Sequence, residues 1–239
     1  MSTVVVEPPP DLFDITEIAN HVRTVAKTLV TEDDEPVDNL YCAKLQRLLV
    51  QVLYASWLPL RRRASPDFTF LADSNVAIYP TLRSNPLVPD VFLSVGVEVG
   101  DDWRATKEPR CYFLWEFGKA PDVVVEIVSN KVGHELDGKL RAYARVGVRY
   151  YVVYDAWLNL GEIPVQVYEL TGGDYRLRPD LELPDVGLGL ILWEGEYEGL
   201  YGDWLRWTDA AGNLLPTGQE RAERLGAKLR ELGIDPDKI

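Results

Sequence analysis

The stretch PDVVVEIVS, residues 121–129, decides the fold. It is almost entirely apolar and rich in β-branched residues apart from Glu126, a pattern typical of a central strand that is covered on both faces. A helix is predicted next, from about Leu136 to Val146, with Gly147 at its C-terminal cap. The run RYYVVYD, residues 149–155, predicts a further strand. Strand, helix and strand make a βαβ unit, which indicates an α/β domain.

Further elements are predicted on both sides of this unit. Upstream, the strand-like runs are FTFLA (68–72), NVAIYP (75–80), PDVFLSV (89–95) and CYFLWEF (111–117). Before them, Leu45, Leu48, Leu49, Val52 and Leu53 share one face of a predicted helix, which has Asp38 or Asn39 as N-cap and ends near Pro59.

The two ends of the chain add smaller elements. A short helix is predicted from Asp14, and VQVYEL and DYRLRP flank a Gly172-Gly173 turn as a β-hairpin. Thr217 and Glu220 have capping-box spacing, so a C-terminal helix should start there. We expect an extended arm over residues 1–13, one α/β domain over 14–215 and a helical tail over 216–239.

Composition restricts the class of protein. No run of about 18 apolar residues and no secretory signal is present, and Cys42 and Cys111 are too few for a disulfide framework, so a soluble cytoplasmic protein is expected. No nucleotide-binding loop motif occurs, and two histidines exclude a His-rich metal site. The formal charge of −13 disfavours nucleic acid at long range, an effect that a metal ion and a few basic side chains can offset locally.

Two acidic residues lie in apolar strand sequences. Glu126 inside VVVEIV is costly to bury without compensation, which leaves two interpretations: a salt bridge to a nearby Lys or Arg, or a metal ligand. Asp90 in LVPDVFLSV is a second acid in similar company, and two converging carboxylates would supply the oxygen ligands that Mg²⁺ prefers. Asp122 lies four residues before Glu126 on the same strand, about 13 Å away, too far to chelate the same ion.

The helix after Glu126 carries two more candidate residues. Lys139 and Tyr143 are four apart and therefore on one face. If this helix packs over the Glu126 strand, Lys139 can reach the carboxylates, where it would orient water and neutralise charge on phosphorus. The alternative for Lys139 is a solvated helix lysine.

The succession VPDVFLSVGV, YFLWEFGKAPDVVVEIVS and DGKLRAYARVGVRYYVVYD resembles the Uma-type family of restriction-endonuclease-like proteins, from about Asp38 to the end of the chain. The resemblance implies a mixed central sheet flanked by helices and a signature of Pro-Asp followed by (Asp/Glu)-x-Lys. On that signature, Asp90, Glu126 and the backbone carbonyl of Ile127 would bind Mg²⁺ or Mn²⁺. Val128 stands where the signature has Lys, and Lys139 is the best candidate for a migrated lysine.

The chain also departs from the family pattern at the start of the helix that is predicted before the strands. Relatives often have an acid and a His near its start, and this chain offers Asp38 as a possible auxiliary residue with Cys42 in the His position. The first functional hypothesis is an Mg²⁺-dependent endonuclease acting on DNA as a homodimer, without a nucleotide cofactor or membrane. The alternatives are a catalytically inactive nuclease-fold binding or assembly module, and a metal-dependent hydrolase of another phosphoester.

Overall fold

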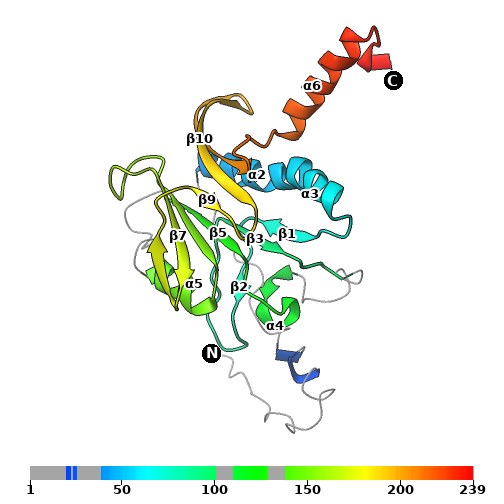
Figure 1. Cartoon of the computed structure of the whole chain (residues 1–239). Helices are drawn as coiled ribbons and strands as arrows, with labels where there is room; N and C mark the ends of the chain where they lie inside the picture. The colour runs from blue at the N-terminus through cyan, green and yellow to red at the C-terminus, as the bar shows by residue number, and fades with distance from the viewer. Residues whose placement is uncertain (1–19, 23, 26–38, 101–109, 129–137, 239) are drawn as a thin grey trace.

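A computed structural model describes residues 20–22, 24–25, 39–100, 110–128 and 138–238 (Figure 1). The predicted N-terminal arm, residues 1–13, lies outside these ranges. Of the helix predicted from Asp14, only residues 20–22 and 24–25 are described, and they are helical. Within the described ranges, none of the helices combines the length and apolar character that a membrane crossing requires.

The centre of the molecule is a six-stranded mixed sheet in the order β1-β3-β5-β6-β7-β8. Its strands are β1 (Phe70–Asp73), β3 (Val91–Val95), β5 (Val123–Ile127), β6 (Tyr150–Tyr154), β7 (Val165–Thr171) and β8 (Asp174–Leu177). β5 and β6 are parallel and joined through α5 (Leu140–Val146), whose C-cap is Gly147 with φ 91°. All other neighbours are antiparallel. The predicted βαβ unit and the hairpin at Gly172-Gly173 are therefore confirmed.

Both faces of the centre of this sheet are covered, because β3, β5 and β6 are almost entirely apolar and buried. The first core lies between one face, the helix α2 (Leu40–Val52) and a three-stranded sheet in the order β11 (Leu200–Asp209), β10 (Leu188–Tyr197) and β9 (Glu182–Leu183). The second core lies on the opposite face beneath α5 and the short parallel pair β2 (Ile78–Tyr79) and β4 (Tyr112–Phe113). All five residues of β5 are buried, so Glu126 is enclosed with its apolar neighbours.

The early helix was predicted correctly at its start and wrongly at its end. Asn39 is the N-cap, with its side chain accepting a hydrogen bond from the Cys42 amide. The helix does not end near Pro59. It continues through a π-helical segment, η1 (Leu53–Trp57), into α3 (Leu58–Ala64), with Pro59 in the first turn of α3. Proline is tolerated there because a first-turn residue needs no amide donor.

Two other predictions need correction. The run CYFLWEF is a strand only over Tyr112–Phe113, and Leu114–Phe117 forms the single-turn helix α4, closed by Gly118 at φ 72°. Sequence patterning also missed the longest hairpin, β10 (Leu188–Tyr197) with β11 (Leu200–Asp209), whose partner on the other side is β9 (Glu182–Leu183). Glycines and acidic residues interrupt the apolar alternation there, so the period of a strand is obscured.

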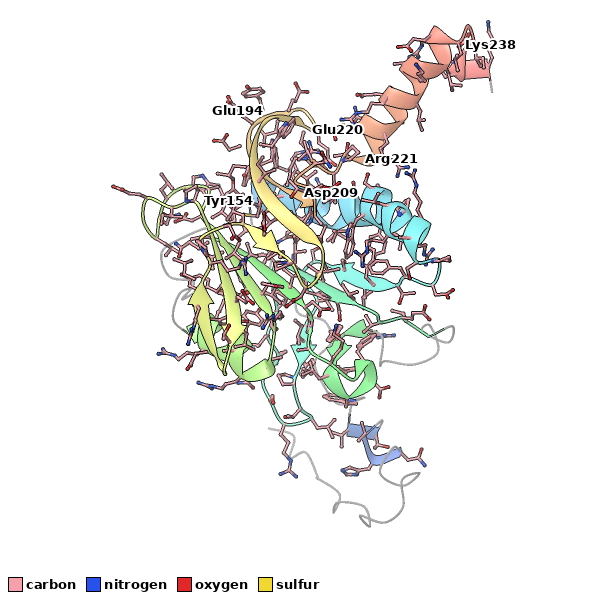
Figure 2. The ribbon with its side chains drawn as sticks, viewed as in Figure 1. Tyr154, Glu194, Asp209, Glu220, Arg221 and Lys238 are labelled. Atoms are coloured by element: carbon pink, nitrogen blue, oxygen red, sulfur yellow. The ribbon has the colours of Figure 1, made fainter. Side chains whose placement is uncertain are left out.

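The C-terminal helix α6 (Gly218–Glu231) projects from the body of the molecule, and none of its residues is buried (Figure 1). Its predicted capping box between Thr217 and Glu220 is confirmed. Glu220 also makes a two-pronged ion pair with the buried Arg206 of β11, at 2.8 and 2.7 Å. Figure 2 labels Glu220 at the base of α6 and Lys238 beyond its far end. The base of α6 is therefore fixed, while its length is exposed.

We predict that Glu220→Gln destabilises the fold by about 2 kcal/mol, because it leaves the buried Arg206 guanidinium without a matching charge. This cost is below that of breaking a fully buried pair, because 30% of the Glu220 side chain is exposed to screening solvent. Urea unfolding measures the change. Glu223→Gln, one turn further along the exposed helix, is the matched control and should change stability by less than about 0.5 kcal/mol. Equal effects of the two substitutions would contradict this account.

Candidate functional site

The candidate site is centred on Glu126, which is 1% exposed near the C-terminal end of β5. The Lys139 ammonium lies 2.8 Å from its Oε2 atom, and the Tyr143 hydroxyl donates to Oε1 at 2.8 Å. Lys139 is the N-cap of α5 and Tyr143 lies within this helix, so the two partners of Glu126 are one helical turn apart, as predicted. The salt-bridge interpretation of Glu126 is therefore realised, and its partner is the lysine that the metal-site interpretation also names.

Burial dominates the electrostatics of Glu126. It raises the pKa of this carboxyl from 4.5 to about 7, a shift that the Lys139 charge reduces and the negative Asp90 increases. The pKa of Tyr143 is raised well above its ordinary value by burial and by the Glu126 charge, so its hydroxyl remains a donor. Glu126 thus sits in an environment with too little positive charge for a fully ionised carboxylate.

Asp90 lies immediately before β3 and is 8% exposed. Its Oδ2 atom accepts from the Ile127 amide at 2.6 Å, which ties it to β5 one residue beyond Glu126. The register of β3 and β5 pairs Val91 with Val125, so extending it by one position brings Asp90 opposite Glu126. Directly opposed residues in antiparallel strands have Cβ atoms roughly 5 Å apart. The structure therefore brings the two acids together.

Two residues of this network were missed in the sequence. Gln46 of α2 donates from Nε2 to Asp90 Oδ1 at 2.9 Å, and its Oε1 accepts from the Asn75 side chain at 3.0 Å. Gln46 is 3% exposed and stands on the buried helix face with Leu45 and Leu49. The sequence did contain a signal for this role of Gln46, since it is a polar residue within the apolar stripe of the helix. Asn75, with φ 54°, occupies a left-handed turn that asparagine tolerates.

The other residues considered in the sequence lie outside this hydrogen-bond network or outside the described residues. Asp122 caps the sheet: its Oδ2 accepts from the Val95 amide at 2.7 Å and pairs with Lys119 at 2.5 Å. This agrees with its exclusion from the site. Asp38, the possible auxiliary residue, lies outside the described residues. Cys42, which the family resemblance aligned with a histidine position, is buried in the first core.

The donor set suits a hard divalent cation. Two carboxylates and a backbone carbonyl at Ile127 are oxygen ligands of the kind that Mg²⁺ and Mn²⁺ prefer, and each carboxylate oxygen retains lone pairs beyond the hydrogen bonds described. When Glu126 is ionised, Asp90, Glu126 and Lys139 together carry one net negative charge, and a dication would relieve the mutual repulsion of the acids. In the described part of the chain, no group of three or more His, Cys, Asp or Glu side chains is arranged to hold a metal ion.

We predict a pH-dependent stability that belongs to Glu126. In metal-free protein the unfolded chain ionises this carboxyl through 4.5, whereas the folded chain keeps its proton until about 7. The free energy of unfolding should therefore fall by about 3 kcal/mol as pH rises between these values, and then stay level. Glu126→Gln should abolish this fall in urea titrations with EDTA. The exposed control Glu196→Gln should retain it, and a parent-like fall in Glu126→Gln would contradict the assignment.

Comparison with known proteins gives one family. No curated protein matches the chain. The family model Uma2, described as "Putative restriction endonuclease", matches residues 38–192, which include β1 to β8, Asp90, Glu126 and Lys139. The mixed α/β architecture, with a central mixed sheet flanked by helices, agrees with a restriction-endonuclease-like fold. The chain therefore belongs to the Uma2 family of restriction-endonuclease-like proteins.

Proposed function

We propose that this protein is a divalent-metal-dependent endonuclease that hydrolyses DNA phosphodiester bonds at Asp90, Glu126 and Lys139. The observation that carries the proposal is the convergence of the two acids with the Lys139 ammonium 2.8 Å from Glu126. Membership of the family supports a nuclease-like function. DNA as the substrate and Mg²⁺ or Mn²⁺ as the cofactor are further parts of our proposal.

Each residue has a role that follows from its surroundings. Asp90 and Glu126, with the Ile127 carbonyl, would hold the cation, which when bound neutralises charge on the phosphate and activates the attacking water. Tyr143 holds Glu126 through its hydroxyl. Lys139 is the exposed member, with 37% of its side chain accessible, so it can turn from Glu126 toward an incoming phosphate. Its charge would then stabilise the pentavalent phosphorus as negative charge develops.

The net charge of −13 bears on how DNA would bind. Affinity from phosphate neutralisation alone is weak for such an acidic chain, so binding would depend on the cation and on local contacts in the site. The closed Lys139–Glu126 ion pair also suits the alternative, a binding or assembly module in which this pair is purely structural. A DNA cleavage assay distinguishes the endonuclease from the binding or assembly module.

We predict that the purified protein cleaves DNA with Mg²⁺ or Mn²⁺, and that Asp90→Asn and Glu126→Gln each lower the rate at least about 100-fold, which corresponds to about 3 kcal/mol of lost stabilisation. Lys139→Met should cost about 100-fold. The assay uses supercoiled, linear duplex and single-stranded DNA, with metal binding followed by calorimetry.

Asp122→Asn is the matched control for this assay, since Asp122 also follows a proline and precedes β5. It should cleave within a few-fold of the parent. Activity that survives in Asp90→Asn and Glu126→Gln would indicate a contaminating nuclease. Absence of both cleavage and metal binding in the parent would reject the endonuclease and favour the binding module.

We also propose that two copies pair through α6. Ala222, Leu225, Leu229 and Leu232 repeat at the three-four spacing of a coiled-coil seam, and Leu225 and Leu232 are 62% and 66% exposed. Residues 218–231 carry four basic and three acidic side chains, so the net charge of this segment is close to zero. Pairing through it therefore avoids most of the electrostatic repulsion expected between two chains of charge −13. Two heptads form only a short seam, and a concentration-dependent dimer is expected.

Leu225→Glu should convert the dimer to a monomer in sedimentation equilibrium, because it places a carboxylate in the seam. Leu177→Glu on β8 is the matched control, since Leu177 is 53% exposed and lies on the edge strand. It should leave the dimer intact. A parent that stays monomeric at every concentration, or equal dissociation by both substitutions, would reject pairing through α6.

A further inference from the structure

A pocket of about 560 Å³ opens on the second-core side of the sheet, over β1 and β3. Its volume falls within the range typical of small-molecule sites, roughly 300–1,000 Å³. We call it the β1–β3 pocket. Leu71 of β1, Phe92 of β3, Tyr112 and Phe117 are among the residues that line it. None of these residues belongs to the metal-site proposal above.

The pocket adjoins the carboxylates. Phe92 pairs with Val124 in the β3–β5 register, and Glu126 lies two residues beyond Val124 on the same face of β5. Phe92 and Glu126 are therefore diagonal neighbours, and such pairs are about 7–8 Å apart. A phosphate held at Glu126 would thus have the base of an adjoining nucleotide within reach of the pocket.

The lining has the chemistry of a base-binding site. Leu71, Val76 and Phe117 are partly exposed and offer apolar surface, while the Phe117 ring stacks on buried Tyr112 at 4.5 Å and 15°. This stacking supports Phe117 as a platform for a planar base. The exposed side chains of Asp73 and Arg110 stand at the rim, providing a hydrogen-bond acceptor and donors for the edges of a base.

We propose that the β1–β3 pocket binds an unpaired nucleobase next to the scissile phosphate, an inference that rests on the proposed nuclease function. A base stacked within a duplex cannot enter such a pocket, so the preferred substrate is single-stranded or locally unpaired DNA. Base stacking contributes affinity that does not depend on neutralising phosphates. It therefore suits a chain whose charge is −13.

The test follows binding without cleavage. A single-stranded oligonucleotide with one 2-aminopurine is titrated with the full-length protein in EDTA and again with Ca²⁺, exciting outside the tryptophan band. The parent should quench the fluorescence and bind the single strand at least tenfold more tightly than the same sequence in a duplex. Replacing the 2-aminopurine by an abasic site in an end-labelled strand should weaken binding by a similar factor.

Two substitutions separate the pocket from the rest of the surface. Val76→Trp fills the β1–β3 pocket and should weaken binding at least tenfold, whereas Ile191→Trp, at a 43% exposed position on β10, should bind as the parent does. Asp73→Asn alters the rim; because Asn can still accept from the Ser74 amide, this variant should change base preference with no loss of stability. Thermal melting verifies that each variant is folded.

The outcomes also separate this inference from the proposed function. Parent-like binding by a folded Val76→Trp, equal binding of the abasic strand, or no binding in either condition would overturn the pocket assignment. If the parent cleaves DNA and Val76→Trp cleaves equally well, the pocket assignment fails and the nuclease stands. If pocket-dependent binding is found in a protein that cleaves nothing, the nuclease fails and base binding stands.

Discussion

The burial of the Glu126 carboxylate is the constraint on which the other features of the site depend. An acid that is 1% exposed inside an apolar strand is costly unless its environment compensates for the lost hydration. Lys139 and Tyr143 supply that compensation from one helix, at 2.8 Å each. The position of α5 over β5 is thus tied to the electrostatics of a single side chain. The compensation is incomplete, since the pKa of Glu126 is still raised to about 7.

The second acid is held by a different part of the fold. Asp90 is oriented by the Ile127 amide from the sheet and by Gln46 from α2, and Asn75 fixes the orientation of the Gln46 amide. Both oxygens of Asp90 are therefore held by hydrogen bonds from the protein itself. The layer that contains α2 is itself anchored to the β10–β11 hairpin, where the Trp207 indole donates to the Leu49 carbonyl. Geometry at the site is consequently set by all three layers of the molecule.

The sequence predicted the central sheet well where the pattern is local. β6 is a continuous apolar run and β5 is apolar apart from Glu126, and the turn at Gly172-Gly173 and the cap at Gly147 need positive φ that glycine provides. It also predicted Asp90, Glu126 and Lys139 as neighbours, through strand and helix periodicity combined with the family resemblance. It failed for Gln46 and Asn75. The Gln46–Asp90 and Asn75–Gln46 bonds join residues 44 and 29 positions apart, and no periodic pattern records such a contact.

Val128 occupies the position at which the family signature has a lysine. The signature implied by the family resemblance would put a lysine at this strand position, two residues beyond Glu126. Val128 is instead fully buried in the second core, together with Tyr143 of α5. A charged side chain there would have to be desolvated, and it would remove apolar surface against which α5 packs. With valine at this position, the second core continues beneath α5, and the Lys139 ammonium at the start of α5 lies 2.8 Å from Glu126. The valine at position 128 and the Lys139–Glu126 ion pair thus belong to the same region of contact between the helix and the sheet.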